Sequence, residues 1–278
     1  MLWFSSRVKY LCKKYQPKKT YITCQRTIMK IELIGFDFAV NSNHKLDIFK
    51  EVVNNSDSDL ILFPGHTLRD EEDIHYLYMH IENTKPTIVF ELEEADPTSC
   101  MHTRNELYIF RNGDFEDLYT SQIFATADDI NGNESLIRKF FDELPRRSFT
   151  CCGKRITVLQ CGETALLSSQ KKDNYKSGFR FAYNEELNQR YLDMLNSTDI
   201  FLNPIHDLQG EQGIMNQRRI ALSGDNRYYM STAALNREMC GKFESKRLQY
   251  VLHNGRELNV KPFVNSEMGY VVRTICID

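Results

Sequence analysis

Residues 153–163 read GKRITVLQCGE, and this stretch decides how the rest of the chain is interpreted. Its apolar, β-branched run predicts a buried strand over Lys154–Gln160. Cys161 follows at once, so its thiol should lie at the carboxyl end of the strand, where α/β sheets bind ligands. Gly162 permits a sharp turn and close approach of a substrate to backbone N–H groups, and Glu163 could polarise the thiol. Cys161 is therefore a candidate nucleophile, with an inert buried thiol as the alternative.

Short apolar runs alternate with longer amphipathic ones on both sides of this stretch. Before it, the pattern predicts strands and helices in alternation at Ile31–Phe38, His44–Val53, Asp59–Phe63, residues 70–82 and Thr87–Leu92. After it, a helix, a strand, a helix and a strand are predicted at Glu185–Leu195, Asp199–Asn203, Gly213–Leu222 and Arg227–Thr232. This order indicates an α/β fold with crossover units and helices packed on a sheet.

Turn signals mark two hairpins. Asn112-Gly113 separates strands predicted at Glu106–Arg111 and Asp114–Tyr119, and it supplies the positive φ angles of a type I′ turn. A second hairpin is predicted from Leu248 to Val260. Residues 165–180 hold three lysines among few apolar residues, which predicts a mobile loop.

Composition and charge bound the class of protein. The chain has 278 residues, 41% hydrophobic and 26% charged, as expected of an ordinary folded protein. Residues 1–28 carry seven cations and no acid, whereas residues 29–278 carry 28 cations and 38 acids, a formal charge of −10. We therefore expect a dispensable basic N-terminal extension over residues 1–28 and one domain over residues 29–278. The acidic domain argues against nucleic acid as a partner, and no apolar run is long enough to cross a membrane.

Eight cysteines, without a C-x-x-C pair or zinc-finger spacing to histidine, favour small buried thiols in a reduced compartment. We therefore expect a cytoplasmic protein. No P-loop, G-x-G-x-x-G or G-x-S-x-G string occurs, so the sequence predicts no cofactor and no metal.

The ordered series of segments resembles the nitrilase, or carbon–nitrogen hydrolase, superfamily. Asp59–Pro64 is similar to the family's second strand, and the strand and hairpin from Thr87 to Phe124 are similar to the segment that leads to its lysine. Residues 153–163 resemble the nucleophile strand and turn, and the following strand, helix and strand are matched by Asp199–Pro204, Gln217–Ala221 and Asn226–Met230. The resemblance covers residues 29–262 and implies a four-layer αββα sandwich with a Glu–Lys–Cys catalytic set, in which Cys161 is the nucleophile.

Two positions depart from the family's pattern. The general base should follow Pro64, but residue 65 is glycine, and the lysine should lie near residues 119–122, which read Tyr-Thr-Ser-Gln. The glutamate takes the thiol proton and the lysine helps hold the oxyanion, so both tasks lack their usual group. Gly65→Glu combined with Ser121→Lys is therefore expected to make amide turnover detectable.

His66 is the first candidate for a replacement base, because an imidazole suits that task near neutral pH. The alternative is a loop histidine that points into solvent. Other candidates for an auxiliary acid or cation precede the nucleophile strand, at Asp128, Asp129, Glu134, Lys139 and Arg146.

Two functions follow from these observations. The first is a hydrolase in which Cys161, assisted by His66 and Glu163, attacks the amide or nitrile carbon of a small molecule. The second is a catalytically silent module that binds a small amide-like ligand or another protein. The retained Cys161 favours the first function, and Gly65 with the missing lysine favours the second.

We predict a homodimer, which is the commonest soluble assembly and the pairing expected of nitrilase-like domains. Asn133 should cap a helix whose apolar face, with Phe140, Phe141 and Leu144, could lie near the interface; the alternative is that these side chains fill the core. Light scattering at micromolar concentration should give about twice 32.6 kDa. A mass near 32.6 kDa would contradict the prediction.

Overall fold

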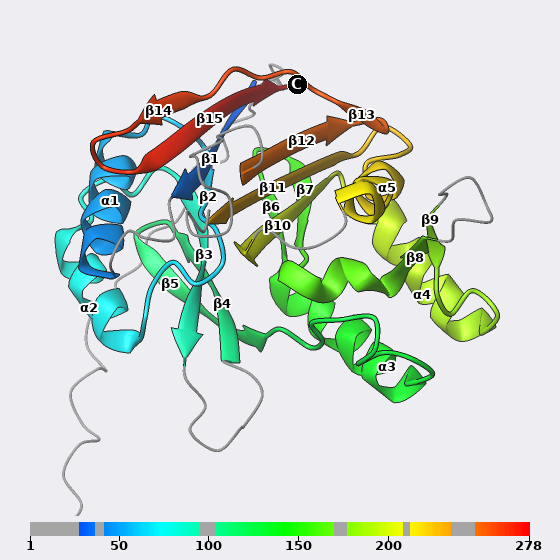
Figure 1. Cartoon of the computed structure of the whole chain (residues 1–278). Helices are drawn as coiled ribbons and strands as arrows, with labels where there is room; N and C mark the ends of the chain where they lie inside the picture. The colour runs from blue at the N-terminus through cyan, green and yellow to red at the C-terminus, as the bar shows by residue number, and fades with distance from the viewer. Residues whose placement is uncertain (1–27, 37–41, 95–103, 170–176, 208–211, 235–247) are drawn as a thin grey trace, which may run out of the picture.

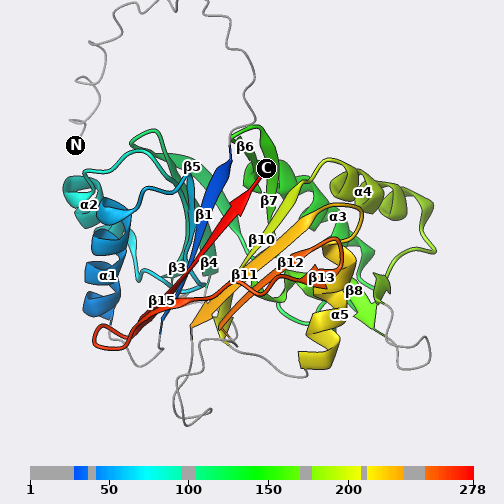
Figure 2. The same cartoon turned by 90° about the horizontal axis from the view of Figure 1, so that it is seen from above.

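Two β-sheets lie face to face between two layers of helices in the computed structural model (Figures 1 and 2). The structure describes residues 28–36, 42–94, 104–169, 177–207, 212–234 and 248–278. Of the predicted N-terminal extension it describes only Ile28, which is exposed, so the rest of that prediction lies outside the described residues.

The first sheet has the strand order β14-β15-β1-β2-β3-β4-β5. Its strands are, in chain order, β1 (Met29–Phe36), β2 (Leu60–Leu62), β3 (Thr87–Glu94), β4 (Arg104–Arg111), β5 (Asp114–Ser121), β14 (Phe263–Asn265) and β15 (Tyr270–Ile277). β1, β2 and β3 run parallel, as the predicted crossover units require. β15 pairs antiparallel with β1 over its whole length.

The second sheet has the order β13-β12-β11-β10-β7-β6. Its strands are β6 (Ser148–Cys151), β7 (Lys154–Val158), β10 (Ile200–Asp207), β11 (Tyr228–Ala234), β12 (Gln249–His253) and β13 (Arg256–Glu257). β7, β10 and β11 run parallel, so their carboxyl ends meet at one edge of the sheet. That edge carries Cys161.

Helices cover the outer faces of both sheets. α1 (Ser42–Asn55) and α2 (Glu71–His80) pack on the first sheet through a cluster that includes Phe49, Phe63 and Phe90. α3 (Glu134–Glu143), α4 (Glu185–Asn196) and α5 (Gln212–Leu222) lie on the side of the second sheet (Figure 2). A third cluster, of β1, β2, β7, β10 and β11 side chains, fills the space between the sheets. The predicted four-layer αββα sandwich is confirmed.

Short-range signals set several element boundaries, and those at Asn133 and Asn112-Gly113 were predicted. Asp70 caps α2 by accepting from the N–H groups of Glu72 and Asp73. Asn133 caps α3 in the same way. Asn112 and Gly113 take φ angles of 57° and 82° at the tip of the β4–β5 hairpin. The local sequence therefore decides where these elements begin and turn.

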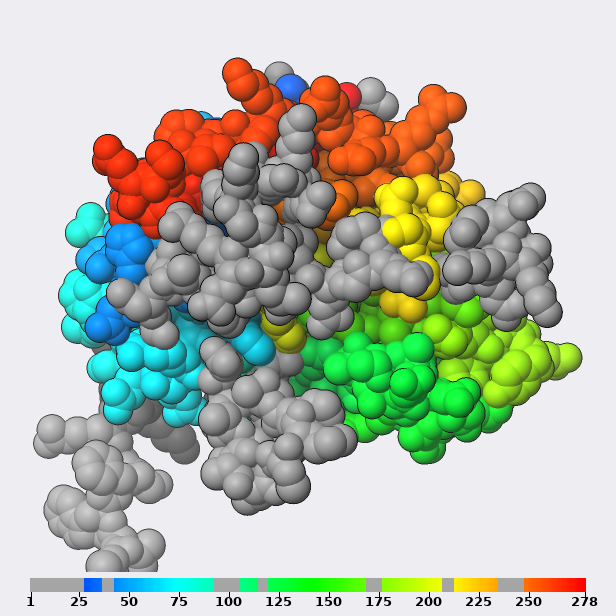
Figure 3. All heavy atoms as spheres, viewed as in Figure 1, coloured from blue at the N-terminus to red at the C-terminus, as the bar shows by residue number. Residues whose placement is uncertain are grey.

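The structure contains strands that the sequence did not predict, among them the short strand β6. The C-terminal strands β14 and β15 were not predicted; β15 alternates only in its second half, because both faces of its first half are largely covered. In Figure 3 these strands, in orange and red, form the upper rim of the molecule. Residues 165–180 were expected to form a mobile loop, but their described parts contain the paired strands β8 (Leu167–Ser169) and β9 (Ser177–Phe179).

The apolar face of α3 is part of the core. Phe140, Phe141 and Leu144 are all buried in the cluster between α3, α4 and the second sheet. They are not available to a subunit interface, so they lend no support to the predicted homodimer, which stays a prediction. Among the described residues, no helix is both long and apolar enough to span a membrane.

Candidate active site

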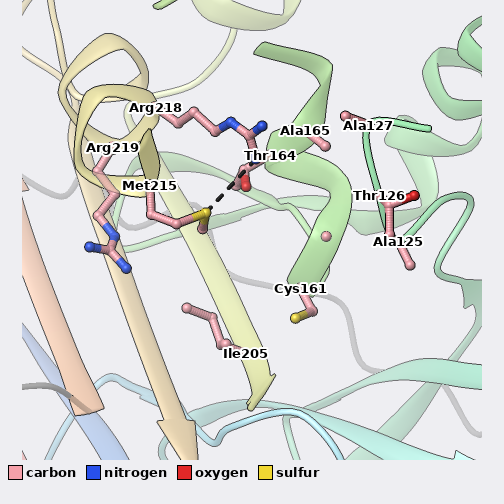
Figure 4. A pocket seen from close by; sticks show the side chains of 11 residues that line it. Ala125, Thr126, Ala127, Cys161, Thr164, Ala165, Ile205, Met215, Arg218 and Arg219 are labelled. Atoms are coloured by element: carbon pink, nitrogen blue, oxygen red, sulfur yellow. Dashed lines mark hydrogen bonds between the residues drawn. The ribbon is translucent and has the colours of Figure 1, made fainter. Parts of the chain in front are cut away.

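Cys161 begins a short 3-10 helix, η2 (Cys161–Leu166), at the carboxyl end of β7. The side chain is 5% exposed and lines a pocket of about 150 Å³ (Figure 4). One wall of this pocket is the loop Ala125–Ala127, and the opposite wall comes from α5. The nucleophile predicted from the sequence therefore lies in a small cavity at the edge of the sheet.

Gly162 is required by the close approach of two backbone segments. A Cβ atom on Gly162 would lie 1.8 Å from the carbonyl oxygen of Ala125. Because that oxygen belongs to the backbone, any side chain at position 162 would force the two segments apart. The sequence predicts that a substrate approaches the backbone here. The structure shows that the loop lining the pocket approaches it.

Glu163 holds the nucleophile turn in place. It is fully buried, and its Oε2 accepts hydrogen bonds from Nη1 of Arg147 at 2.6 Å and from the N–H of Gln160 at 2.8 Å. Its Oε1 accepts from the N–H of Ile123 at 2.9 Å. Both carboxylate oxygens are thus engaged, and the structure gives Glu163 a structural role in place of the expected polarising one.

Arg147 supplies a cation close to the position expected for the family's lysine. It belongs to η1 (Leu144–Arg147), and its Nη2 donates to Oγ1 of Thr120 at 2.7 Å and to the carbonyl of Ser121 at 3.1 Å. The side chain is completely buried, and its charge is compensated by Glu163. Arg147 therefore fixes the site's framework; the sequence analysis named its neighbour Arg146 and missed it.

His206 interacts with Cys161. It lies near the end of β10, and its Nε2 is 2.6 Å from Oε2 of Glu91, a fully buried residue of β3. Gln160 donates from Nε2 to the other oxygen of Glu91 at 3.0 Å. The structure thus joins a thiol, an imidazole and a carboxylate in one chain of side-chain contacts.

Electrostatics favour the charged form of His206. Burial opposes it, but the Glu91 carboxylate and the hydrogen bond with Cys161 outweigh burial and raise the pKa of His206 to about 10. The imidazole is therefore protonated at neutral pH. An imidazolium beside a thiol is the arrangement that activates cysteine nucleophiles.

The glycine at position 65 makes room for His206. A Cβ atom on Gly65 would lie 1.9 Å from Cδ2 of His206 and 2.8 Å from Oε2 of Glu91. A glutamate at position 65 would therefore displace the His206 ring. The expectation that Gly65→Glu with Ser121→Lys restores turnover is corrected, because the first change would break up the contacts of His206.

His66 lies beside the site and contacts His206, which interacts with Cys161. It has a φ angle of 55°, its carbonyl accepts from Nζ of Lys45 at 2.9 Å, and its ring stacks on His206 with centroids 3.9 Å apart. The sequence predicts His66, next to Gly65, as the base, whereas the imidazole that interacts with the thiol belongs to His206 of the second sheet.

The remaining candidates from the sequence have structural or exposed positions, and Asp128 is exposed. Asp129 accepts from the N–H groups of Ala125 and Thr126 and so shapes the pocket loop. Glu134 accepts from Asn184 at the start of α3. Lys139 and Arg146 are exposed. Sequence reasoning missed Glu91 and His206; the available signals were an acid within the apolar run of β3 and a histidine at the carboxyl end of β10.

No protein-family model matches the chain, and no curated protein sequence matches it. The structure is similar to a glutamine-dependent NAD(+) synthetase from Cytophaga hutchinsonii, with a TM-score of 0.53 and 12% identity over 90% of this chain. This chain covers 43% of that synthetase, less than half of its length. It is also similar to a CN-hydrolase superfamily protein from Xanthomonas campestris that has an arsenic adduct in its active site, with a TM-score of 0.50 and 13% identity. That match covers 90% of this chain and 91% of the other.

The fold is that of the CN-hydrolase superfamily. The resemblance seen in the ordered sequence segments is thus confirmed at the level of the fold. On that fold, this chain carries the Cys161–His206–Glu91 arrangement. The family resemblance implies a glutamate directly after Pro64, but that residue is Gly65, and the His206 ring lies against it.

Arg147→Leu should lower the free energy of unfolding by about 3–5 kcal/mol, because it leaves the Glu163 carboxylate buried without its cation. Thermal unfolding of Arg146→Leu provides the matched control, since the neighbouring arginine is exposed and 3.6 Å from Glu143. A surface substitution of this kind changes stability by only about 0.5 kcal/mol. Equal unfolding temperatures for the two variants would show that the Arg147–Glu163 pair is not needed for stability.

Gly65→Ala should separate His206 from Glu91, because the added methyl group would overlap the imidazole. We expect the pKa of His206, followed by NMR titration, to fall from about 10 towards its ordinary value of 6.5. Gly178→Ala is the control, since a Cβ atom there meets nothing within 4 Å. An unchanged His206 titration in Gly65→Ala would contradict this account of the glycine.

Proposed function

We propose that the chain hydrolyses a carbon–nitrogen bond of a small amide, with Cys161 as nucleophile and His206 as its acid–base partner. The observation that carries the proposal is the interaction of His206 with both Cys161 and Glu91, whose Oε2 lies 2.6 Å from Nε2 of the imidazole. The superfamily fold and the pocket around Cys161 agree with this chemistry.

The reaction requires the anionic form of the sulfur and a proton held on His206. The sulfur attacks the amide carbon, and the carbonyl oxygen becomes an oxyanion that we assign to the N–H of Gly162. Collapse of this intermediate breaks the carbon–nitrogen bond, and His206 gives its proton to the departing nitrogen. Neutral His206 then takes a proton from water, which attacks the thioester and releases the acid and the thiol.

Glu91 is a positioning residue in this mechanism. Its carboxylate orients the imidazole and stabilises the imidazolium, while Gln160 holds the second carboxylate oxygen. One charged histidine would thereby carry out tasks that the family resemblance divides between a glutamate and a lysine. The absence of lysine from residues 119–122 is then compatible with catalysis.

The first test is the reactivity of Cys161. Although it is buried, its thiol should react with iodoacetamide at neutral pH faster than exposed Cys152 in the same peptide map. His206→Asn should slow alkylation of Cys161, but not of Cys152, and should reduce release of ammonia from small aliphatic amides by about 10²–10⁴-fold. His253→Asn, which changes a histidine stacked on Tyr228 away from the pocket, is the control.

The variant Glu91→Gln tests whether Glu91 acts on His206 or only supports the fold. It should lower the pKa of His206 from about 10 towards 6.5, and so move the alkaline limit of activity downwards. Absence of ammonia release, together with alkylation of Cys161 no faster than that of Cys152, would favour the catalytically silent module instead.

A further inference from the structure

Arg218 of α5 reaches into the same pocket as Cys161 (Figure 4). Its Nε atom is buried without a hydrogen-bond partner, and among the described residues its Nη1 meets only the sulfur of Met215, at 3.8 Å. A thioether is a weak acceptor, so little compensates the guanidinium for its lost hydration. Burial, with a further contribution from Arg180, lowers the pKa of Arg218 to about 10, which leaves it charged at neutral pH.

The described lining of the pocket adds positive charge. Its residues include Arg218 and Arg219, and none of these described lining residues is an aspartate or glutamate. Arg219 is already engaged, with its guanidinium 3.6 Å from the centroid of the Tyr250 ring and a hydrogen bond to Tyr229. Arg180 lies behind Ala165, whose carbonyl accepts from its Nε at 2.7 Å. Arg218 is thus the cation that the pocket presents to a ligand.

The pocket also limits the length of that ligand. Figure 4 shows the Arg218 side chain beside Thr164 and Ala165, whereas Cys161 lies at the start of η2. Three residues of a 3-10 helix span about 6 Å, which matches a short carbon chain between two functional groups. A cavity of about 150 Å³ holds a molecule of that size and little more.

We propose that Arg218 binds the carboxylate of the substrate, so that the substrates are small amides with an acid group at the other end, such as monoamides of short dicarboxylic acids. The planar guanidinium binds a carboxylate through two parallel hydrogen bonds. The amide carbon then lies at Cys161, at the other end of η2. This inference rests on the proposed function for the amide end and on Arg218 for the acid end.

The test uses a readout that does not require turnover. Glutarate and its neutral diamide are compared as protectants of Cys161 against iodoacetamide in the unmodified full-length chain. Glutarate should slow alkylation about tenfold more than the diamide, because charge-assisted hydrogen bonds contribute about 1.5–3 kcal/mol. Equal protection by the two compounds would overturn the proposal.

Variants of Arg218 locate the charge selectivity. Arg218→Gln should abolish the preference for glutarate, and Arg218→Lys should restore part of it. Arg138→Gln, in which the exchanged arginine pairs with Glu186 on the surface, should keep the preference. Retained preference in Arg218→Gln would overturn the assignment, and should that variant not fold, the comparison of ligands in the unmodified chain still decides.

Turnover distinguishes this inference from the proposed function. If both hold, the monoamides of succinic and glutaric acid should be hydrolysed with a kcat/KM about tenfold or more above that of butanamide and pentanamide. Protection by glutarate without ammonia release from any amide would support the anion site and contradict the hydrolase. Ammonia release without preference for the acidic amides would contradict the anion site alone.

Discussion

The buried ion pair between Arg147 and Glu163 determines where Cys161 lies. Removing two charges from water is costly, and further hydrogen bonds offset part of that cost, although Nε of Arg147 is buried without a partner among the described residues. Here Glu163 accepts from two backbone N–H groups, and Arg147 donates to the end of β5. The pair thereby ties the nucleophile turn to strands of both sheets, so the geometry of the pocket depends on it.

The space left by a glycine explains how a histidine enters the site. Gly65 belongs to the loop after β2 in the first sheet, whereas His206 comes from β10 in the second. The N–H of Gly65 donates to the carbonyl of Ile205 at 3.2 Å, which brings the two segments into direct contact. The missing side chain at position 65 and the presence of His206 are therefore two sides of one packing arrangement.

Much of the fold could be predicted from the sequence because its signals are local. Periodicity, caps and the Asn112-Gly113 turn identified the helices and most strands, and the resemblance of the ordered segments to the nitrilase superfamily implied the sandwich. The site could be predicted only in part. Cys161 is marked by its own strand, but Glu91 and His206 are 115 residues apart and meet only when the sheets pack. Local patterns also cannot show that the carboxylate of Glu163 forms an ion pair with Arg147.

The distribution of charge around Cys161 determines how a charged ligand would be oriented in the pocket. Arg147 is neutralised by Glu163, and His206 by Glu91, so each of these cations has its own carboxylate at 2.6 Å. Arg218 lacks such a partner among the described residues. The first two cations hold the surroundings of Cys161 in place, and in the proposed mechanism His206 also activates the thiol. An anion bound at Arg218 would supply the missing countercharge, and the stabilisation gained there would orient the rest of the molecule towards the sulfur.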